Sequence, residues 1–362
     1  MSTGDDQARR AAAGTIRRPA DQLLPLLSRS RPRASSAGDP IVSRVIRVSK
    51  LRAEQGPALA LLKMARDPRG AEELRAQRRV LAEITSHPGL DEDLRELLPR
   101  VLAFDERRDA TVSVESYRPG IDLAEALERD PDRVEELTAA ALRAIAPLHR
   151  ATARSIVVDS VCSVRPWVVE PVADLTRVCS RLNPGLVSTL DRLETILARA
   201  FVGRRMTVSW THGAYTPGSI RMVGHRGPVN RIVGWGEARA DRLPLIDLYL
   251  MILTASCQAQ RAALGTVVSD RLRAGGLTDS ERITLYAGHA RMDTEGGDWV
   301  DECLAILLAW LHHTAALCRQ DAGQPKRDVA LTSSLAPVLE AVVAWRGPDA
   351  PTERIATPAV HQ

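Results

Sequence analysis

Residues 211–223, THGAYTPGSIRMV, form the most informative segment of this sequence. It contains a His-Gly pair, a small-residue turn, a Pro-Gly pair and a polar residue that opens an apolar run, an order typical of a catalytic loop. A second stretch, RIVGWGEARADRLPLIDL (231–248), follows closely and ends in a Leu-Pro-Leu-Ile-Asp-Leu helix start. The first stretch contains no acidic residue, and this absence determines what chemistry the loop can perform.

Composition and charge restrict the class of protein. The chain has 362 residues, 44% hydrophobic, 26% charged and 3% aromatic, which is typical of a globular protein with an aliphatic core and two domains or lobes. The formal net charge of +4 is dispersed, and no basic stripe is interleaved with aromatic residues, so nucleic-acid binding is not expected. Five widely spaced cysteines favour reduced thiols over disulfides or a zinc site. We expect a cytoplasmic protein without a signal peptide or a membrane span.

Patterning divides the chain into a β-rich part and a helical part. The runs IVSRVIRVSK and GPALALLKMA predict strands, and DPRGAEELRAQRRVLAEITS predicts a helix. VLAFDERRDATVSVESY predicts a hairpin, and one long amphipathic segment is expected over 168–202. We predict a disordered Arg/Ser/Pro-rich tail over 1–39, an N-lobe over 40–117, a helical C-lobe over 118–340 with the loop-like segment 208–237, and a second tail over 341–362.

The two quoted stretches and this order of elements resemble the aminoglycoside phosphotransferase and choline kinase-like family. WTHGAYTPGSI is similar to the family's His-Gly-Asp-x-x-Pro-Gly-Asn loop, and RIVGWG to its Val-Ile-Asp-Trp segment. The resemblance covers about 40–340. It implies an α+β, protein-kinase-like bilobal fold, with a small β-rich N-lobe and a larger, mainly helical C-lobe.

The resemblance also implies which positions carried the chemistry. In the family, one Asp orients the substrate hydroxyl, and an Asn and a second Asp hold magnesium. These positions fall on Ala214, Ser219 and Gly234, while the loop-shaping His212 is retained. Magnesium prefers oxygen ligands that include a carboxylate. We therefore expect a degenerate site with no catalytic residue and no metal ligand, and we expect no cofactor.

A nucleotide cleft is the further implication of the resemblance. Lys63 aligns with the lysine that grips phosphates, although it could instead be a solvated strand lysine, and its helical partner falls at Gln77 or one turn earlier at Glu73. Glu115 and Tyr117 lie where a tether between lobes would meet an adenine, or they belong to a plain linker. A Gly-rich phosphate loop is not recognisable, which weakens the case for a nucleotide grip. His149 is interpreted as a structural histidine.

Two functions remain open from the sequence. The first is a pseudokinase-type homologue that acts as a binding or scaffold partner of a biosynthetic enzyme in a bacterium. The alternative is an active ATP- and magnesium-dependent phosphotransferase on a small-molecule or peptide hydroxyl, with Glu237 or Asp241 as a displaced acid. We expect a protein partner or a self-dimer, and neither nucleic acid nor membrane. The candidate contact regions are Trp299, Trp310 and the Arg-rich residues 9–33.

Overall fold

Two compact units make up the chain, each assembled from several segments. The computed structural model describes residues 45–345 except 53–57, 108–109, 290–299 and 321–324. The first unit combines 1–157, 205–262 and 278–297, and the second combines 158–204, 263–277 and 298–362. The predicted tail over 1–39 lies outside the described residues.

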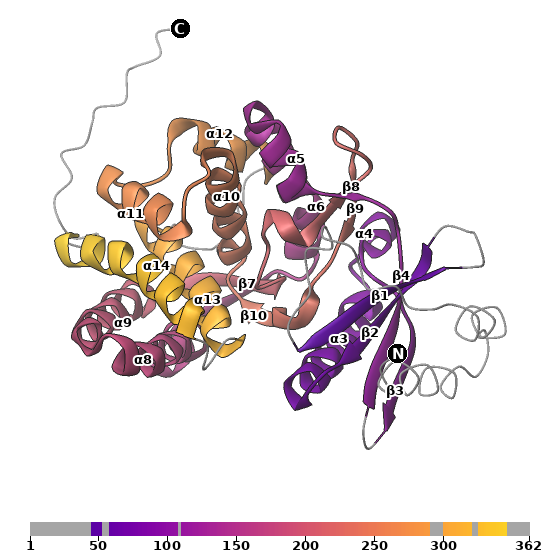
Figure 1. The fold of residues 1–362 in the computed structure, drawn as a ribbon. Coiled ribbons are helices and arrows are strands. Elements are labelled where there is room, and N and C mark those ends of the chain that lie inside the picture. Colours follow the sequence, from indigo (N-terminus) through magenta and orange to yellow (C-terminus); the bar gives the residue numbers. More distant parts are fainter. Residues whose placement is uncertain (1–44, 53–57, 108–109, 290–299, 321–324, 346–362) are drawn as a thin grey trace, which may run out of the picture. The chain divides into compact units, whose positions relative to one another are not determined.

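A four-stranded antiparallel sheet opens the first unit (Figure 1). Alternating side chains separate its two faces. Leu51, Ala60 and Val114 lie on the face that forms a hydrophobic cluster, while Lys63 and Glu115 lie on the other. The strands, in spatial order, are β1 (Ile46–Arg52), β2 (Ala58–Ala65), β4 (Ala110–Ser116) and β3 (Val101–Arg107).

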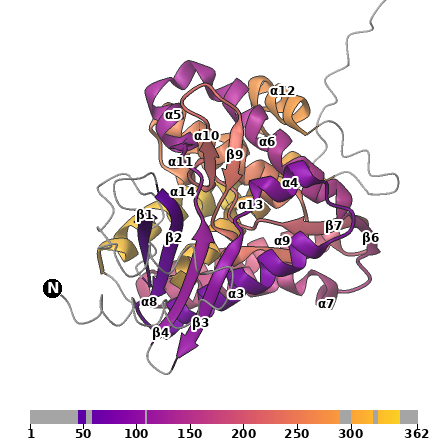
Figure 2. The same cartoon turned by 90° about the vertical axis from the view of Figure 1, so that its right-hand side faces the viewer.

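Helix α3 (Pro68–Ser86) packs against this sheet, as the sequence predicted. Its start is well specified, because Pro68 is the first helical residue and the Asp67 carboxylate accepts a hydrogen bond of 2.8 Å from the Gly70 backbone N–H. The short helix α4 (Glu92–Leu97), which the sequence analysis did not predict, lies next to β9 (Val229–Ile232) (Figure 2).

The remainder of the first unit is mainly helical, with two small three-stranded sheets in the orders β10-β7-β6 and β5-β8-β9. These sheets contain strands from the two motif-bearing segments, residues 211–223 and 231–248. The strands are β5 (Ile121–Asp122), β6 (Arg154–Val157), β7 (Arg205–Thr211), β8 (Ile220–Met222), β9 and β10 (Arg239–Arg242). The helices are α5 (Leu123–Arg129), α6 (Val134–Ala151), α10 (Leu245–Gln260) and α12 (Asp279–Gly288), with short 3-10 turns η2 (Pro131–Arg133), η5 (Pro217–Ser219) and η6 (Trp235–Glu237).

The second unit is helical throughout its described residues. The single amphipathic segment expected over 168–202 is in fact two helices, because Asn183 and Pro184 form a turn between them. Its elements are α7 (Val161–Val164), the π-helical turn η3 (Arg165–Val169), α8 (Glu170–Leu182), η4 (Pro184–Leu186), α9 (Val187–Phe201), α11 (Leu264–Ala274), α13 (Glu302–Gln320) and α14 (Pro325–Ala344). Within the described ranges, no helix has the length and apolar character needed to cross a bilayer.

A correction concerns Trp310 on α13. The sequence analysis offered it as a surface contact residue, but its side chain is 0% exposed inside the second unit. The run CLAILLAWL is apolar around the whole helix, so every residue from Cys303 to Leu311 is buried. Trp299 and residues 9–33 lie outside the described residues, so these contact regions stay predictions.

Candidate functional site

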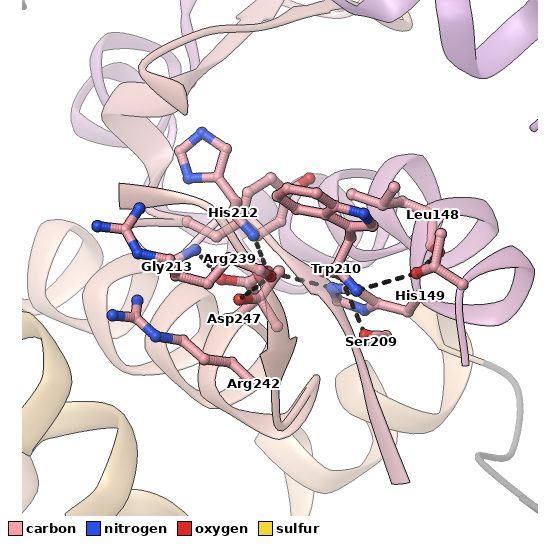
Figure 3. Close-up of polar contacts among 12 residues, drawn as sticks. Leu148, His149, Ser209, Trp210, His212, Gly213, Arg239, Arg242 and Asp247 are labelled. Carbon is pink, nitrogen blue, oxygen red and sulfur yellow. Dashed lines mark hydrogen bonds and ion pairs between the residues drawn. The ribbon is translucent and has the colours of Figure 1, made fainter. Parts of the chain in front are cut away.

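Asp247 anchors the catalytic-loop-like segment from the first turn of α10 (Figure 3). The carboxylate is 0% exposed. One oxygen accepts hydrogen bonds from the His212 backbone N–H at 2.6 Å and from Nε2 of His149 at 3.1 Å, and the other accepts from the Gly213 N–H at 2.8 Å. We call His149, His212, Gly213 and Asp247 the loop anchor. The prediction of a structural role for His149 agrees with this geometry.

The charge states in the loop anchor follow from its burial. Burial by itself raises the pKa of Asp247, but the hydrogen bond from His149, the proximity of the His149 and His212 rings and the bond from the His212 backbone outweigh it, so the pKa lies below its usual value. Burial lowers the pKa of His212, which keeps the imidazole neutral. Its Nε2 donates to the Val233 carbonyl at 2.9 Å, and Nδ1 accepts from the Ala214 N–H at 3.3 Å.

Close packing explains why the His-Gly pair is retained. The His212 ring packs edge-on against Trp235 and Tyr215, with ring centroids 4.7 and 5.6 Å away. Gly213 has φ of 77°, and a Cβ there would lie 2.3 Å from the Glu237 carbonyl oxygen. Only glycine satisfies both conditions without strain. Both residues therefore shape the loop, and neither offers a free catalytic group.

The three positions that carry chemistry in the family are held together through Val233. The Ala214 backbone N–H donates a hydrogen bond to Nδ1 of His212, and Nε2 of the same ring donates to the Val233 carbonyl. The Val233 N–H in turn donates to the Ser219 carbonyl at 2.8 Å, and Gly234 follows directly with φ of 86°. These bonds link the segments that carry Ala214, Ser219 and Gly234 through Val233. None of the three offers a carboxylate.

The Ser219 hydroxyl is already used locally. It accepts a hydrogen bond from the Thr216 N–H at 3.1 Å and donates to the Thr216 carbonyl at 2.6 Å, closing the turn η5. Its proton is therefore committed, and its side chain is buried. Serine at this position has a structural explanation that does not involve a metal.

A cavity of about 110 Å³ lies in the first unit, between the sheet face that carries Lys63, helix α3 and strands β8 and β9. We call it the Lys63 cavity. The three tentative nucleotide residues of the sequence analysis, Lys63, Glu115 and Tyr117, all line it, and so does Gly234. Its other lining residues are Ile46, Val48, Leu61, Glu73, Gln77, Pro99, Ser116, Arg118, Arg221, Arg231, Val233 and Gly236.

Lys63 is bonded to two groups in this cavity. Its Nζ lies 2.8 Å from a carboxylate oxygen of Glu115 and donates to Oε1 of Gln77 at 3.3 Å. Gln77 is thus the residue of α3 that contacts the lysine, in accordance with the first of the two predicted placements. The carboxylate comes from Glu115 on β4. Sequence reasoning missed this pairing, because it assigned to Glu115 a backbone role in the tether.

Two arginines of the cavity were also missed. Arg221 on β8 and Arg231 on β9 are directly opposite each other in the strand register, and both line the cavity. Arg221 lies 2.9 Å from the Asp122 carboxylate. Arg231 donates to the Leu98 carbonyl at 2.9 Å and to the Ser116 hydroxyl at 3.0 Å. A signal existed, since SIRMV and NRIV each place one arginine inside a short apolar strand.

Glu237 and Asp241, the displaced acids of the alternative hypothesis, lie outside the Lys63 cavity. Glu237 belongs to η6, where its backbone carbonyl accepts a hydrogen bond of 3.1 Å from Arg242, and Asp241 is an exposed residue of β10. Neither residue lines the Lys63 cavity. Among the described residues, no group of three His, Cys, Asp or Glu side chains is placed to hold a metal ion.

Known proteins share the fold of this chain. The sequence pattern of the phosphotransferase enzyme family, APH, matches residues 47–293. No curated protein matches the chain. The solved streptomycin–ATP complex of APH(2'')-IIa matches with a TM-score of 0.52 and 11% identity, covering 90% of this chain and 99% of that one. ADP-bound aminoglycoside phosphotransferase APH(2'')-Ib gives a TM-score of 0.51 at 11% identity, with 90% and 99% covered.

Aminoglycoside phosphotransferase APH(3'')-Id from Streptomyces rimosus is 15% identical, with a TM-score of 0.45 and with 82% of this chain and 98% of that chain covered. At such identities the similarity to solved structures concerns the fold alone. The predicted fold class is confirmed: an α+β, protein-kinase-like fold with a small β-sheet N-terminal region and a helical C-terminal part.

Proposed function

Because the chain belongs to the phosphotransferase enzyme family, we propose that it is a non-catalytic member that binds a ligand or a partner and transfers no phosphoryl group. The observation that carries this proposal is the group of Ala214, Ser219 and Gly234 around Val233. The loop anchor keeps the geometry of a catalytic loop, while these three positions lack the acids and the amide that would act there.

Magnesium does not fit these positions. A magnesium ion that bridges nucleotide phosphates is usually held by one or two carboxylates. Ala214 and Gly234 have no side-chain oxygen, and the proton and one lone pair of the Ser219 hydroxyl are engaged by Thr216. We therefore expect that the protein catalyses no reaction of a magnesium–nucleotide complex.

The state of Lys63 supports the same proposal. A lysine that grips phosphates acts as a positive point charge. In active protein kinases the corresponding lysine pairs with a glutamate of the neighbouring helix. Here its Nζ lies 2.8 Å from the Glu115 carboxylate on β4, and the helix residue that contacts it is the neutral Gln77. A phosphate would have to compete with a buried ion pair.

Calorimetric titration with ATP, in magnesium and separately in EDTA, tests the proposal. We expect no metal-dependent binding. A dissociation constant of about 10 μM or lower that is lost in EDTA would refute it. A positive control is the triple variant Ala214→Asp, Ser219→Asn, Gly234→Asp, which should gain magnesium-dependent binding. Gly234→Asp alone checks the fold, because φ of 86° strains any side chain, although aspartate tolerates it better than most.

The alternative predicts turnover. Under it, the wild type would consume ATP when offered an acceptor such as streptomycin or gentamicin, the ligands of related solved structures. Glu237→Gln or Asp241→Asn would abolish that activity. We expect no ATP consumption above a heat-denatured sample. Turnover that disappears in Glu237→Gln would establish the displaced-acid mechanism.

The second part of the proposal concerns binding partners. We propose that the protein is cytoplasmic and forms either a complex with a biosynthetic enzyme or a self-dimer, with an interface of upwards of about 1,000 Å². Light scattering of the purified chain measures self-association. Co-purification from the native host measures a hetero-complex. A strict monomer that recovers no stoichiometric partner contradicts this half, and leaves the absence of catalysis standing.

A further inference from the structure

We propose that the Lys63 cavity binds a small organic anion, a carboxylate or a phosphate monoester with an apolar body, without any divalent cation. The inference deepens the proposed function, since it rests on the cavity not being the seat of a metal–nucleotide complex. It is carried by two buried hydrogen-bond donors that have no acceptor and by an arginine that no acid contacts.

The unpaired donors are the side-chain amide of Gln77 and Nε of Arg231. Each residue is 4% exposed, and each lines the cavity. Oε1 of Gln77 accepts from Lys63, but its Nε2 has no acceptor among the described residues, and neither has Nε of Arg231. Buried donors are almost always satisfied in folded proteins. Two unsatisfied donors on one cavity indicate a ligand that supplies oxygen acceptors.

Charge favours an anion over a neutral acceptor. Four cationic and two acidic side chains line the cavity. Glu115 contacts Lys63, and Asp122 contacts Arg221, whereas Arg231 donates to the Leu98 carbonyl and the Ser116 hydroxyl. Burial and the nearby charges of Arg118 and Arg100 outweigh the opposing charge of Glu115 and lower the pKa of Arg231 to about 10, so the group stays charged at neutral pH.

The strand register strengthens the argument. Arg221 and Arg231 are cross-strand partners, and like charges directly opposite each other destabilise a sheet. An anion beside them would relieve that repulsion. The apolar part of the ligand has its own wall, because Val48 and Leu61 on the sheet and Val233 after β9 line the same cavity.

Phenyl phosphate and benzoate are suitable probes, because each joins an apolar ring to an anionic group. Phenol and inorganic phosphate separate the two contributions. All four are titrated by calorimetry in EDTA, where a metal cannot contribute. We expect at least one aromatic anion to bind with a dissociation constant below about 1 mM, and phenol at least about tenfold more weakly.

Two variants locate the binding in the cavity. Arg231→Met removes the charge and Gln77→Leu removes the amide, and each should weaken the anion by about tenfold or more. Arg79→Met, which changes an exposed arginine of α3, should leave the affinity unchanged. If Arg231→Met does not melt cooperatively, Arg231→Lys replaces it, since lysine keeps the charge and lacks the Nε donor.

Failure takes distinct forms. If neither aromatic anion binds up to about 10 mM, or if phenol binds as well as the anions, water alone satisfies the donors and the inference is overturned. Equal binding by Arg231→Met and the wild type also overturns it. Magnesium-dependent ATP binding would refute the proposed function separately, because the anion titrations contain no metal.

Discussion

The loop anchor and the Lys63 cavity lie in the same unit and treat buried polar groups differently. In the loop anchor, both oxygens of Asp247 and both ring nitrogens of His212 have partners, and Nδ1 of His149 is the one side-chain atom left without a partner among the described residues. In the cavity, Gln77 and Arg231 each keep an unpaired donor. Backbone N–H groups bound by a buried carboxylate fix the shape of a loop, whereas unpaired donors that line a cavity are available to a ligand. We therefore expect changes in the loop anchor to act on stability, and we keep the cavity as the candidate for binding.

The largest effect should come from Asp247→Ala. It removes the acceptor of two backbone N–H groups and of His149, all of them buried, so the free energy of unfolding should fall by about 3–5 kcal/mol. Urea unfolding measures it. Asp93→Ala, at an exposed position of α4, should change it by less than about 0.5 kcal/mol. Equal effects would mean that the loop anchor does not hold the loop.

Lys63→Met tests how much the ion pair in the Lys63 cavity contributes to stability. It leaves the Glu115 carboxylate, which is 2% exposed, without its cation, and should cost about 3 kcal/mol. The double variant Lys63→Met, Glu115→Leu should recover most of that loss, because an apolar pair carries no desolvation penalty. If the double variant is as unstable as the single one, the ion pair is not what the cavity wall depends on.

His289 gives the loop anchor a pH dependence. Its ring packs 5.6 Å from that of His149, and burial, with the charges of His149 and Arg150, lowers its pKa to about 4. Below about pH 6.5 the His289 imidazole gains a proton in the unfolded chain, whereas in the folded protein it stays neutral until the pH approaches 4. The free energy of unfolding should therefore show no loss from His289 above pH 6.5 and should fall by up to about 3 kcal/mol as the pH decreases towards 4.

Chemical denaturation at several pH values measures that slope. His289→Gln should reduce this slope between pH 6.5 and 4 without abolishing it, because burial also lowers the pKa of His313 to about 4 and that of His212. His87→Gln, at the C-terminal end of α3, is the control. A wild-type stability that is constant over this window would show that His289 takes up its proton in the folded protein.

The smallest effect should come from Ser219→Ala. The turn η5 loses two short hydrogen bonds to Thr216, and the free energy of unfolding should fall by about 1 kcal/mol. Ser180→Ala, which removes one exposed bond on α8, is the matched control. No measurable difference between the two would leave the serine without its structural explanation.

Local patterns predicted most elements of the first unit. Alternation and turn residues were enough for β1 to β4, and Pro68 and the apolar period were enough for α3. The short α4 and the strands β6 and β10 were missed, because a few residues carry too little periodicity. The break between α8 and α9 did have a signal, the Asn-Pro-Gly of residues 183–185, which the strong amphipathic pattern concealed.

The site was predictable where it depends on order along the chain. Ala214, Ser219 and Gly234 follow from the spacing of two motifs. The bond between Lys63 and Glu115 does not, because it depends on which residues of β2 and β4 share a sheet face, and hence on register. The same holds for Arg221 and Arg231, whose pairing across β8 and β9 requires the hairpin to be known.

The first unit is gathered from three separate segments of the chain, and this sets the timing of its assembly on the ribosome. Lys63 leaves the ribosome long before Arg231, and at about 5–20 residues per second the roughly 170 residues between them take some ten to thirty seconds. During that interval the sheet β1–β4 has no β8 or β9 to cover its open face. A chain interrupted after residue 204 would contain the whole four-stranded sheet and 11 of the 16 residues that line the cavity, but neither Arg221 nor Arg231. We expect such a fragment to expose this face of the sheet and to need chaperones.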